Sequence, residues 1–141
     1  MICTSHLRVR YAETDAMGVV HHAAYVPWFE VGRVQLLRSA GCPYTEIEAR
    51  GLLVVLSDLA VRYRFPAHFD DEVTVHTTLT VLKRRQLAFH YVGLLTSTQQ
   101  VLVEAQTSHI VVQRATMRPT TLPGDLAVAL QPWLNSASCT S

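Results

Sequence analysis

A short segment near the start of the chain holds the residues best suited to chemistry. Residues 14–33 read TDAMGVVHHAAYVPWFEVGR and place Asp15, a glycine and two adjacent histidines directly before a stretch with helical periodicity. The first N–H groups of a helix have no partner within the helix and carry a partial positive charge, so they can polarise a carbonyl group. An ionised carboxylate beside them could attack that carbonyl or activate water. The segment is therefore compatible with acyl transfer, although on spacing alone an aspartate here more often closes a turn or caps a helix.

Other classes of hydrolytic site lack their characteristic sequence patterns. The chain has no Gly-x-Ser-x-Gly segment, and none of Cys3, Cys42 and Cys139 has a recognisable partner in sequence. The seven histidines show no His-Glu-x-x-His or comparable spacing, so we expect no metal and no separate cofactor. Asp15 is therefore the candidate nucleophile or general base.

The elements that must position this segment follow from hydrophobic periodicity. Residues 6–11 alternate as in a half-buried strand, and residues 23–40 repeat apolar side chains on one helical face. Pro27 fits the first turn of that helix, and Gly41 followed by Pro43 would end it. Stretches rich in β-branched and aromatic residues, typical of strands, follow at about residues 52–65, 72–82, 86–96 and 100–114.

This order of elements predicts an α+β fold with one long helix on an antiparallel sheet of about five strands. Consecutive strands with short links are expected to pair with each other. Gly32 lies in mid-helix, where glycine costs up to roughly 1 kcal/mol relative to alanine. Either the helix approaches the sheet closely there, or the glycine is simply tolerated. Residues 43–51 could form a short helix, and residues 126–134 a last helical turn or a segment along the sheet.

The composition indicates one domain with a weakly charged surface. We place the domain at residues 1–134 and expect residues 135–141 to be a disordered tail. Hydrophobic residues make up 49% of the chain and charged residues 16%, which predicts surface buried in a homo-oligomer. The net charge of +1 disfavours nucleic-acid binding, and no apolar run suits a signal peptide or membrane insertion. Three widely spaced cysteines favour a reducing, cytoplasmic location.

Three motifs, in order within residues 8–123, resemble one enzyme family. Asp15-x-x-Gly18-x-Val20-x-x-x-x-Tyr25-x-x-x-x-Glu30 is similar to the active-site segment of the hotdog-fold acyl-CoA thioesterases, in the 4-hydroxybenzoyl-CoA thioesterase-like branch that includes the Tol-Pal-associated enzymes. YRFPAHFDD at 63–71 resembles that branch's link between two strands, and RPTTLP at 118–123 resembles its ending after the last strand. The resemblance implies a hotdog fold, in which the sheet wraps one long central helix, and hydrolysis of an acyl-CoA thioester.

The resemblance also implies roles for the residues around Asp15, which takes the position of the catalytic carboxylate. His22 matches a histidine before the helix that would orient substrate, water or Asp15. Gly18 would let the loop approach the thioester closely, and backbone N–H groups of residues 20–24 would bind its carbonyl oxygen. His21 stands where relatives often have Tyr or Phe, and we favour His22 over His21 as the histidine that faces the chemistry.

Three further residues are expected to contact the substrate. Val20 and Tyr25 belong to the motif, but the helical spacing of Tyr25, Trp28 and Phe29 also suits a plain packed core. Met17 stands where many relatives have a second glycine. We expect it to narrow the pocket and to restrict substrates to short, medium or aromatic acyl groups.

Coenzyme A is part of the substrate, and its phosphates require a few cations at the mouth of the site. Lys83, Arg84 and Arg85 are the local candidates, although a charged hairpin end is usually only solvated. Sites of this family form between subunits, which implies a homodimer or homotetramer. Acyl carrier protein is an alternative carrier of the acyl group.

Two other functions stay open at this point. A hotdog hydratase or dehydratase would move a proton at carbon in enoyl or hydroxyacyl thioesters, and a non-catalytic module would only bind an acyl thioester. A rival carboxylate, Glu30, lies further along the helix, where its i,i+3 spacing to Arg33 predicts a structural ion pair.

Overall fold

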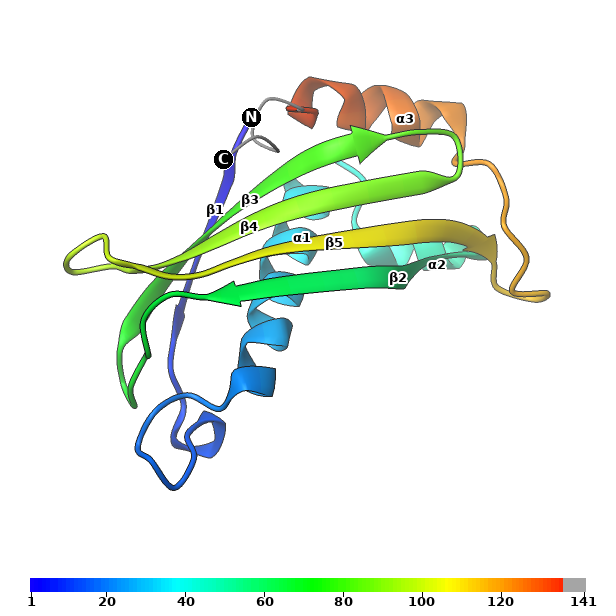
Figure 1. The fold of residues 1–141 in the computed structure, drawn as a ribbon. Helices are drawn as coiled ribbons and strands as arrows, with labels where there is room; N and C mark the ends of the chain where they lie inside the picture. The colour runs from blue at the N-terminus through cyan, green and yellow to red at the C-terminus, as the bar shows by residue number, and fades with distance from the viewer. Residues whose placement is uncertain (136–141) are drawn as a thin grey trace.

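One antiparallel sheet and one long helix make up most of the computed structural model, which describes residues 1–135. The sheet has the order β1-β3-β4-β5-β2 and curves around the helix (Figure 1). Register shifts with an extra residue in β2, β3 and β5 interrupt the ladder and help the sheet to curve. The strands are β1 (Cys3–Arg8), β2 (Leu52–Tyr63), β3 (Glu72–Leu82), β4 (Gln86–Leu95) and β5 (Val101–Gln113). The predicted α+β architecture is confirmed.

The long helix begins with a 3-10 turn, η2 (His22–Tyr25), and continues as α1 (Val26–Ser39). Pro27 lies in the first turn of α1, and Gly41 follows its end with φ of 85°. The short predicted helix is α2 (Tyr44–Ala49), and the C-terminal segment is helical, as α3 (Gly124–Leu130) and η3 (Gln131–Trp133). Within the described residues, no helix has the length and apolar character needed to cross a membrane.

Gly32 marks the point where α1 touches the sheet. A Cβ atom built on Gly32 would overlap Thr77 Oγ1 of β3 and would lie 3.2 Å from Val75 Cγ1. Trp28, Phe29, Leu36 and Leu37 bury the same face of the helix. The close approach, rather than a tolerated glycine, therefore explains this position.

Two predictions about the strands are wrong. β1 covers Cys3–Arg8 rather than residues 6–11, because the chain leaves the sheet after Val9, whose N–H donates to Asp71 O, and enters the 3-10 turn η1 (Tyr11–Glu13). β2 pairs with β5 along its length and not with its successor β3. The link of residues 64–71 carries the chain across to the other side of the sheet, so β2 becomes an edge strand.

The last residue that the structure describes, Asn135, contacts the sheet. The Asn135 N–H donates to Leu79 O of β3 at 2.8 Å, so Asn135 joins the packed domain instead of the tail. Residues 136–141 of the predicted tail lie outside the described residues.

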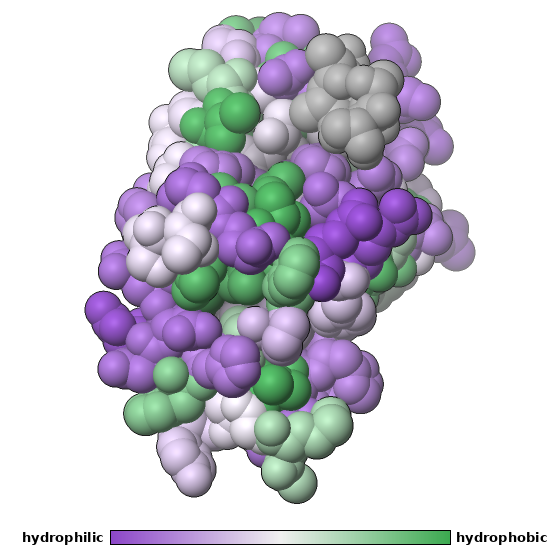
Figure 2. All heavy atoms as spheres, turned by 60° about the vertical axis from the view of Figure 1, so that its left-hand side comes forward, coloured by the Kyte–Doolittle hydropathy of each residue, from purple (hydrophilic) through white to green (hydrophobic). Residues whose placement is uncertain are grey.

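Hydrophobic side chains reach the surface in several places. Figure 2 shows one face of the molecule, on which hydrophobic groups lie between hydrophilic ones. On edge strand β2 and directly after it, four large apolar side chains are 41–54% exposed: Leu56, Leu59, Tyr63 and Phe65. An exposed apolar edge strand of this kind offers unpaired main-chain groups to another strand.

Candidate active site

Asp15 begins a tight turn that projects from the end of the sheet, in the blue segment of Figure 1. Its N–H donates to Val19 O at 2.9 Å, and its carbonyl accepts the Gly18 N–H at 3.0 Å. Gly18 has φ of 80°, a conformation that glycine adopts without strain. In the side chain, Oδ1 accepts the Met17 N–H at 2.8 Å, whereas no described residue bonds Oδ2. Asp15 therefore closes the turn and still keeps one carboxylate oxygen for chemistry.

The start of the long helix leaves one main-chain donor unused among residues 20–24. The Val20 N–H donates to Ala67 O, and the His21 N–H donates to Glu13 O, both at 2.8 Å. The His21 ring caps η2 through Nδ1, which accepts the Ala23 N–H at 3.1 Å, and Ala24 N–H donates to His21 O. Within the described chain, only the His22 N–H of this group has no acceptor, which narrows the predicted set of donors to one.

A pocket of about 300 Å³ brings most of the predicted site residues together. Its predicted lining residues are Asp15, Met17, Val20, His22 and Tyr25. Gly18 shapes the turn instead of lining the pocket, and the His21 side chain caps η2, so His22 is the histidine that lines the pocket. Met17 is 80% exposed, so in a single chain it borders the pocket without closing it.

The opposite wall of the pocket comes from residues that were not predicted as site residues. They are Tyr63, Arg64, Phe65 and Pro66 at the end of β2. Val19 of the Asp15 turn also lines the pocket and was not predicted either. The Tyr63 hydroxyl donates to His22 O at 2.6 Å, and the Tyr63 ring lies edge-on to Tyr25, with centroids 5.2 Å apart. The YRFPAHFDD motif was the available signal, but its sequence does not reveal that it faces the Asp15 turn.

Tyr25 is part of both the pocket and the core. Its side chain is 3% exposed, and burial raises the pKa of its hydroxyl. That hydroxyl accepts the Ala67 N–H at 3.4 Å. Trp28 and Phe29 are buried in the core and are absent from the pocket lining, so the core interpretation holds for these two.

The predicted phosphate-binding cations lie far from Asp15 within one chain. Lys83, Arg84 and Arg85 form the turn between β3 and β4, whereas the Asp15 turn joins the opposite end of the sheet, where β2 ends. A strand of the length of β3 spans roughly 30 Å at ~3.3 Å per residue. One chain therefore does not bring these side chains to the pocket.

Glu30 does not form the predicted pair with Arg33. Arg33 donates instead to the Tyr91 hydroxyl at 3.1 Å, while Glu30 is exposed and has no ion pair in the described chain. Glu30 and Arg33 line a separate cavity of about 150 Å³. No group of three or more His, Cys, Asp or Glu within residues 1–135 could hold a metal ion.

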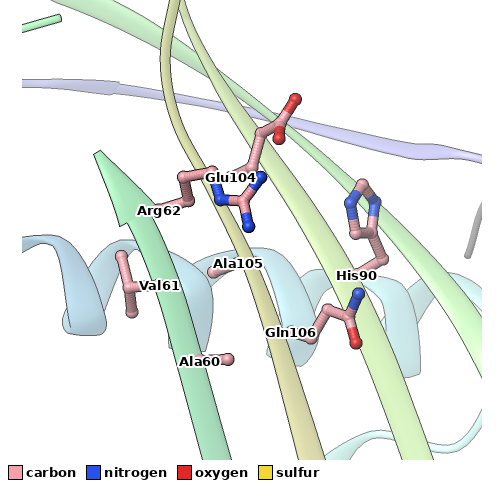
Figure 3. A pocket seen from close by; sticks show the side chains of 7 residues that line it. All are labelled: Ala60, Val61, Arg62, His90, Glu104, Ala105 and Gln106. Atoms are coloured by element: carbon pink, nitrogen blue, oxygen red, sulfur yellow. The ribbon is translucent and has the colours of Figure 1, made fainter. Parts of the chain in front are cut away.

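A second pocket, of about 260 Å³, lies on the side of the sheet that faces away from α1 (Figure 3). Arg62 of β2, Glu104 and Gln106 of β5 and His90 of β4 project into it. Glu104 pairs with Arg64 at 3.1 Å, whereas the other three side chains have no hydrogen bond in the described chain. Burial lowers the pKa of His90, an effect that Glu104 partly opposes.

The chain is similar in sequence and in fold to known proteins. The family model of the thioesterase-like superfamily matches residues 9–130. The chain belongs to this superfamily. It is 32% identical over 118 residues to the putative acyl-CoA thioesterase YneP of Bacillus subtilis, covering 84% of this chain and 85% of the relative.

Two further relatives of this thioesterase-like chain support the same assignment. The acyl-CoA thioester hydrolase YbgC of Escherichia coli is 32% identical over 117 residues, which cover 83% of this chain and 87% of YbgC. The structure of the DHNA-CoA thioesterase of Staphylococcus aureus is 27% identical in sequence and matches with a TM-score of 0.89, over 93% of this chain and 89% of that one. The predicted hotdog fold and family are confirmed.

Proposed function

We propose that the pocket beside Asp15 and His22 is the active site of an acyl-CoA thioesterase. Acyl-CoA thioester hydrolysis is the activity class of this chain, because curated relatives matching more than four-fifths of it carry that activity. The observation that carries the proposed site is the pairing of a free carboxylate oxygen on Asp15 with an unused N–H on His22 in one pocket. No cofactor besides the coenzyme A of the substrate is required.

The chemistry follows from these two groups. The His22 N–H, at the start of the long helix, donates to the thioester carbonyl oxygen and stabilises its negative charge in the transition state. The His21 N–H and the His22 carbonyl on either side are held by Glu13 and Tyr63, which keeps this donor in place before substrate binds. The His22 ring borders the pocket and orients substrate or water.

Asp15 can begin the reaction by either of two balanced routes. As a nucleophile, Oδ2 bonds to the carbonyl carbon, the C–S bond breaks and the thiolate takes a proton from solvent; water then cleaves the mixed anhydride and restores Asp15. As a general base, Asp15 takes a proton from water as the water oxygen bonds to the carbonyl carbon; the C–S bond then breaks, and Asp15 returns the proton to the leaving thiolate. An acyl-aspartyl adduct in a rapidly quenched reaction would establish the first route.

The size of the acyl group depends on Met17. In one chain the pocket measures about 300 Å³ and is open beside Met17, so the expected restriction to short, medium or aromatic acyl groups rests on Met17 and not on this volume. Efficient turnover of long, palmitoyl-type chains would contradict it.

We further propose that the protein works as a homodimer joined along β2, with pairs of dimers forming a tetramer. β2 is a twelve-residue edge strand, and Leu56, Leu59 and Tyr63 on it are exposed. A long apolar edge offers unpaired N–H and C=O groups to a second strand. A two-fold axis would pair the two β2 strands antiparallel. The partner's β3–β4 turn, which holds Lys83, Arg84 and Arg85, would then lie at the end of the sheet near Asp15.

The oligomer can be tested by light scattering of the native protein and of Leu59→Lys. The native protein should be a dimer or tetramer, and the added charges facing each other should produce monomers with reduced activity. An active native monomer would contradict the proposal. We also propose a cytoplasmic location, which the free, buried thiols of Cys3 and Cys42 support.

The deciding experiment measures free thiol released from a panel of acyl-CoA and acyl carrier protein thioesters. The native protein should release thiol, and Asp15→Asn at matched folding should not. Conversion of enoyl or hydroxyacyl thioesters without thiol release would favour a hydratase or dehydratase. Thermal stabilisation by acyl-CoA without turnover would favour a binding module.

A further inference from the structure

A second carboxylate, Glu13, lies two residues before Asp15 and is buried. Its side chain is 8% exposed, and both carboxylate oxygens are bonded. Oε1 accepts the Arg10 N–H at 2.8 Å, and Oε2 accepts the indole N–H of Trp28 in α1 at 2.9 Å. A buried carboxylate is costly unless it is satisfied in this way. The three residues therefore fasten the segment before Asp15 to the long helix.

The main chain of Glu13 holds the other end of the same loop. Its carbonyl accepts the His21 N–H at 2.8 Å, next to the free His22 N–H. Between these contacts, a bridge between Thr14 and Val20 closes the loop that carries Asp15. Glu13 is thus the point at which α1, the base of the Asp15 loop and the start of η2 meet.

We infer that Glu13 is a positioning residue for thioester hydrolysis, which sets the Asp15 carboxylate against the His22 N–H through its bonds to Trp28 and His21. This inference rests on the proposed function of that pocket. Glu13 does not line the pocket, so it acts through other residues and does not contact the substrate.

The chemistry of the two acceptor positions requires a carboxylate. Both partners of the Glu13 side chain are N–H donors. Glutamine has the same shape but offers one oxygen and one NH2 group, so it must leave one of the donors facing another donor. A small shift of Glu13 at the base of the loop also moves Asp15. A displacement of the Asp15 carboxylate by a fraction of an ångström lowers the rate without removing any catalytic group.

The test compares Glu13→Gln, Trp28→Phe and the double variant in the thiol-release assay, with thermal melts of each. Trp28→Phe removes the indole donor and keeps a buried ring. We expect each single variant to lower kcat at least tenfold with KM changed less than threefold. The double variant should lose no more than the stronger single variant, since both changes break one connection.

Two controls separate positioning by Glu13 from a direct chemical role. Arg10→Ala removes the exposed guanidinium, whose Nε lies 3.7 Å from Oε1, but keeps the main-chain N–H, so its kcat should stay within twofold of native. The acidic limb of the kcat–pH profile should keep its midpoint in Glu13→Gln. A limb that disappears would make Glu13 itself the acid–base group and overturn the inference.

Failure of this inference is distinguishable from failure of the proposed function. If the native protein releases thiol and Asp15→Asn does not, while Glu13→Gln melts lower with an unchanged kcat, Glu13 is structural only and the inference is wrong. If the kcat of the double variant falls by the product of the two single-variant factors, Glu13 and Trp28 act independently. The hydrogen bond between them then does not position Asp15, and the inference is again wrong. If the native protein releases no thiol from any substrate, the proposed function fails first.

Discussion

The two pockets near the end of β2 differ much more in construction than in size. The pocket beside Asp15 measures about 300 Å³, and the one on the outer face of the sheet about 260 Å³. The outer pocket consists of side chains in regular strand register, such as Arg62 opposite Glu104 and His90 opposite Gln106. The pocket beside Asp15 lies where the backbone is irregular: at a turn, at the 3-10 turn that begins the long helix, and at the end of a strand.

This difference matters because irregular backbone leaves particular main-chain groups available. Inside a sheet, N–H and C=O groups are used by neighbouring strands, so a pocket on its face presents only flexible side chains. At the helix start, the His22 N–H has no described acceptor and is rigidly held. Pre-organised donors of this kind contribute more to catalysis than pocket volume does.

The largest expected difference between the two pockets concerns their carboxylates. Asp15→Asn keeps an oxygen for the Met17 N–H but removes the charge, and kcat should fall about 10³-fold, within the usual range for a positioned acid or base. Glu104→Gln makes the same change in the outer pocket and should leave kcat within about threefold. Initial rates of thiol release check both. Equal losses would mean that the outer pocket takes part in the reaction.

Acid should destabilise the whole fold, and both pockets with it, because the neutral His109 side chain is buried in the sheet. Its side chain is 1% exposed, and burial, with a smaller effect of Arg33, lowers its pKa to about 4. The unfolded chain has the ordinary value near 6.5, so it takes up a proton first as the pH falls. The contribution of the neutral, buried His109 to the free energy of unfolding is fully present above pH ~6.5. About 3 kcal/mol of it should be lost by pH ~4.

Urea denaturation at pH 7, 5.5 and 4 measures this loss. His109→Gln has no proton to gain, so its free energy of unfolding should fall less over the same range, although it starts lower because the bond to Thr107 Oγ1 is disturbed. If the free energy of unfolding fell equally with pH in the native protein and in the variant, the acid sensitivity would come from other groups.

A smaller effect should follow from the contact that fixes the His22 peptide. Tyr63→Phe removes the hydroxyl that donates to His22 O at 2.6 Å but keeps the ring beside Tyr25, so kcat should fall about tenfold. Gln106→Ala in the outer pocket removes a side chain without a described partner and should change nothing. Melting temperatures of both variants should stay within a few degrees of native, and a kcat loss that merely follows a lower melting temperature would contradict the assignment.

The smallest expected difference separates the two pocket histidines. His22→Gln should lower kcat about fivefold, because in the proposed site the ring orients the substrate while the donor to the carbonyl oxygen belongs to the main chain. His90→Gln should leave kcat unchanged. A loss of 10³-fold in His22→Gln would instead make the imidazole a proton carrier in the chemical step, and a measured pH profile would locate its pKa.

The sequence by itself determined the elements and the identity of the candidate catalytic segment. Helix start, helix end and most strands were predictable because Pro27, Gly41 and the alternation of apolar residues act over a few neighbouring positions. The motif from Asp15 to Tyr25 was sufficient for the family, and all of its predicted pocket residues except Gly18 and His21 line one pocket.

Only the tertiary structure decided how distant segments meet. The pairing of β2 with β5, the wall from Tyr63 to Pro66 and the distance of Lys83 from Asp15 depend on where residues 64–71 cross the sheet. The proposed role of Glu13 likewise depends on Trp28, fifteen residues later in the chain, whose indole N–H donates to the buried Glu13 carboxylate. Local patterns cannot report these contacts, because their free energy comes from burial and hydrogen bonds between segments that the sequence separates.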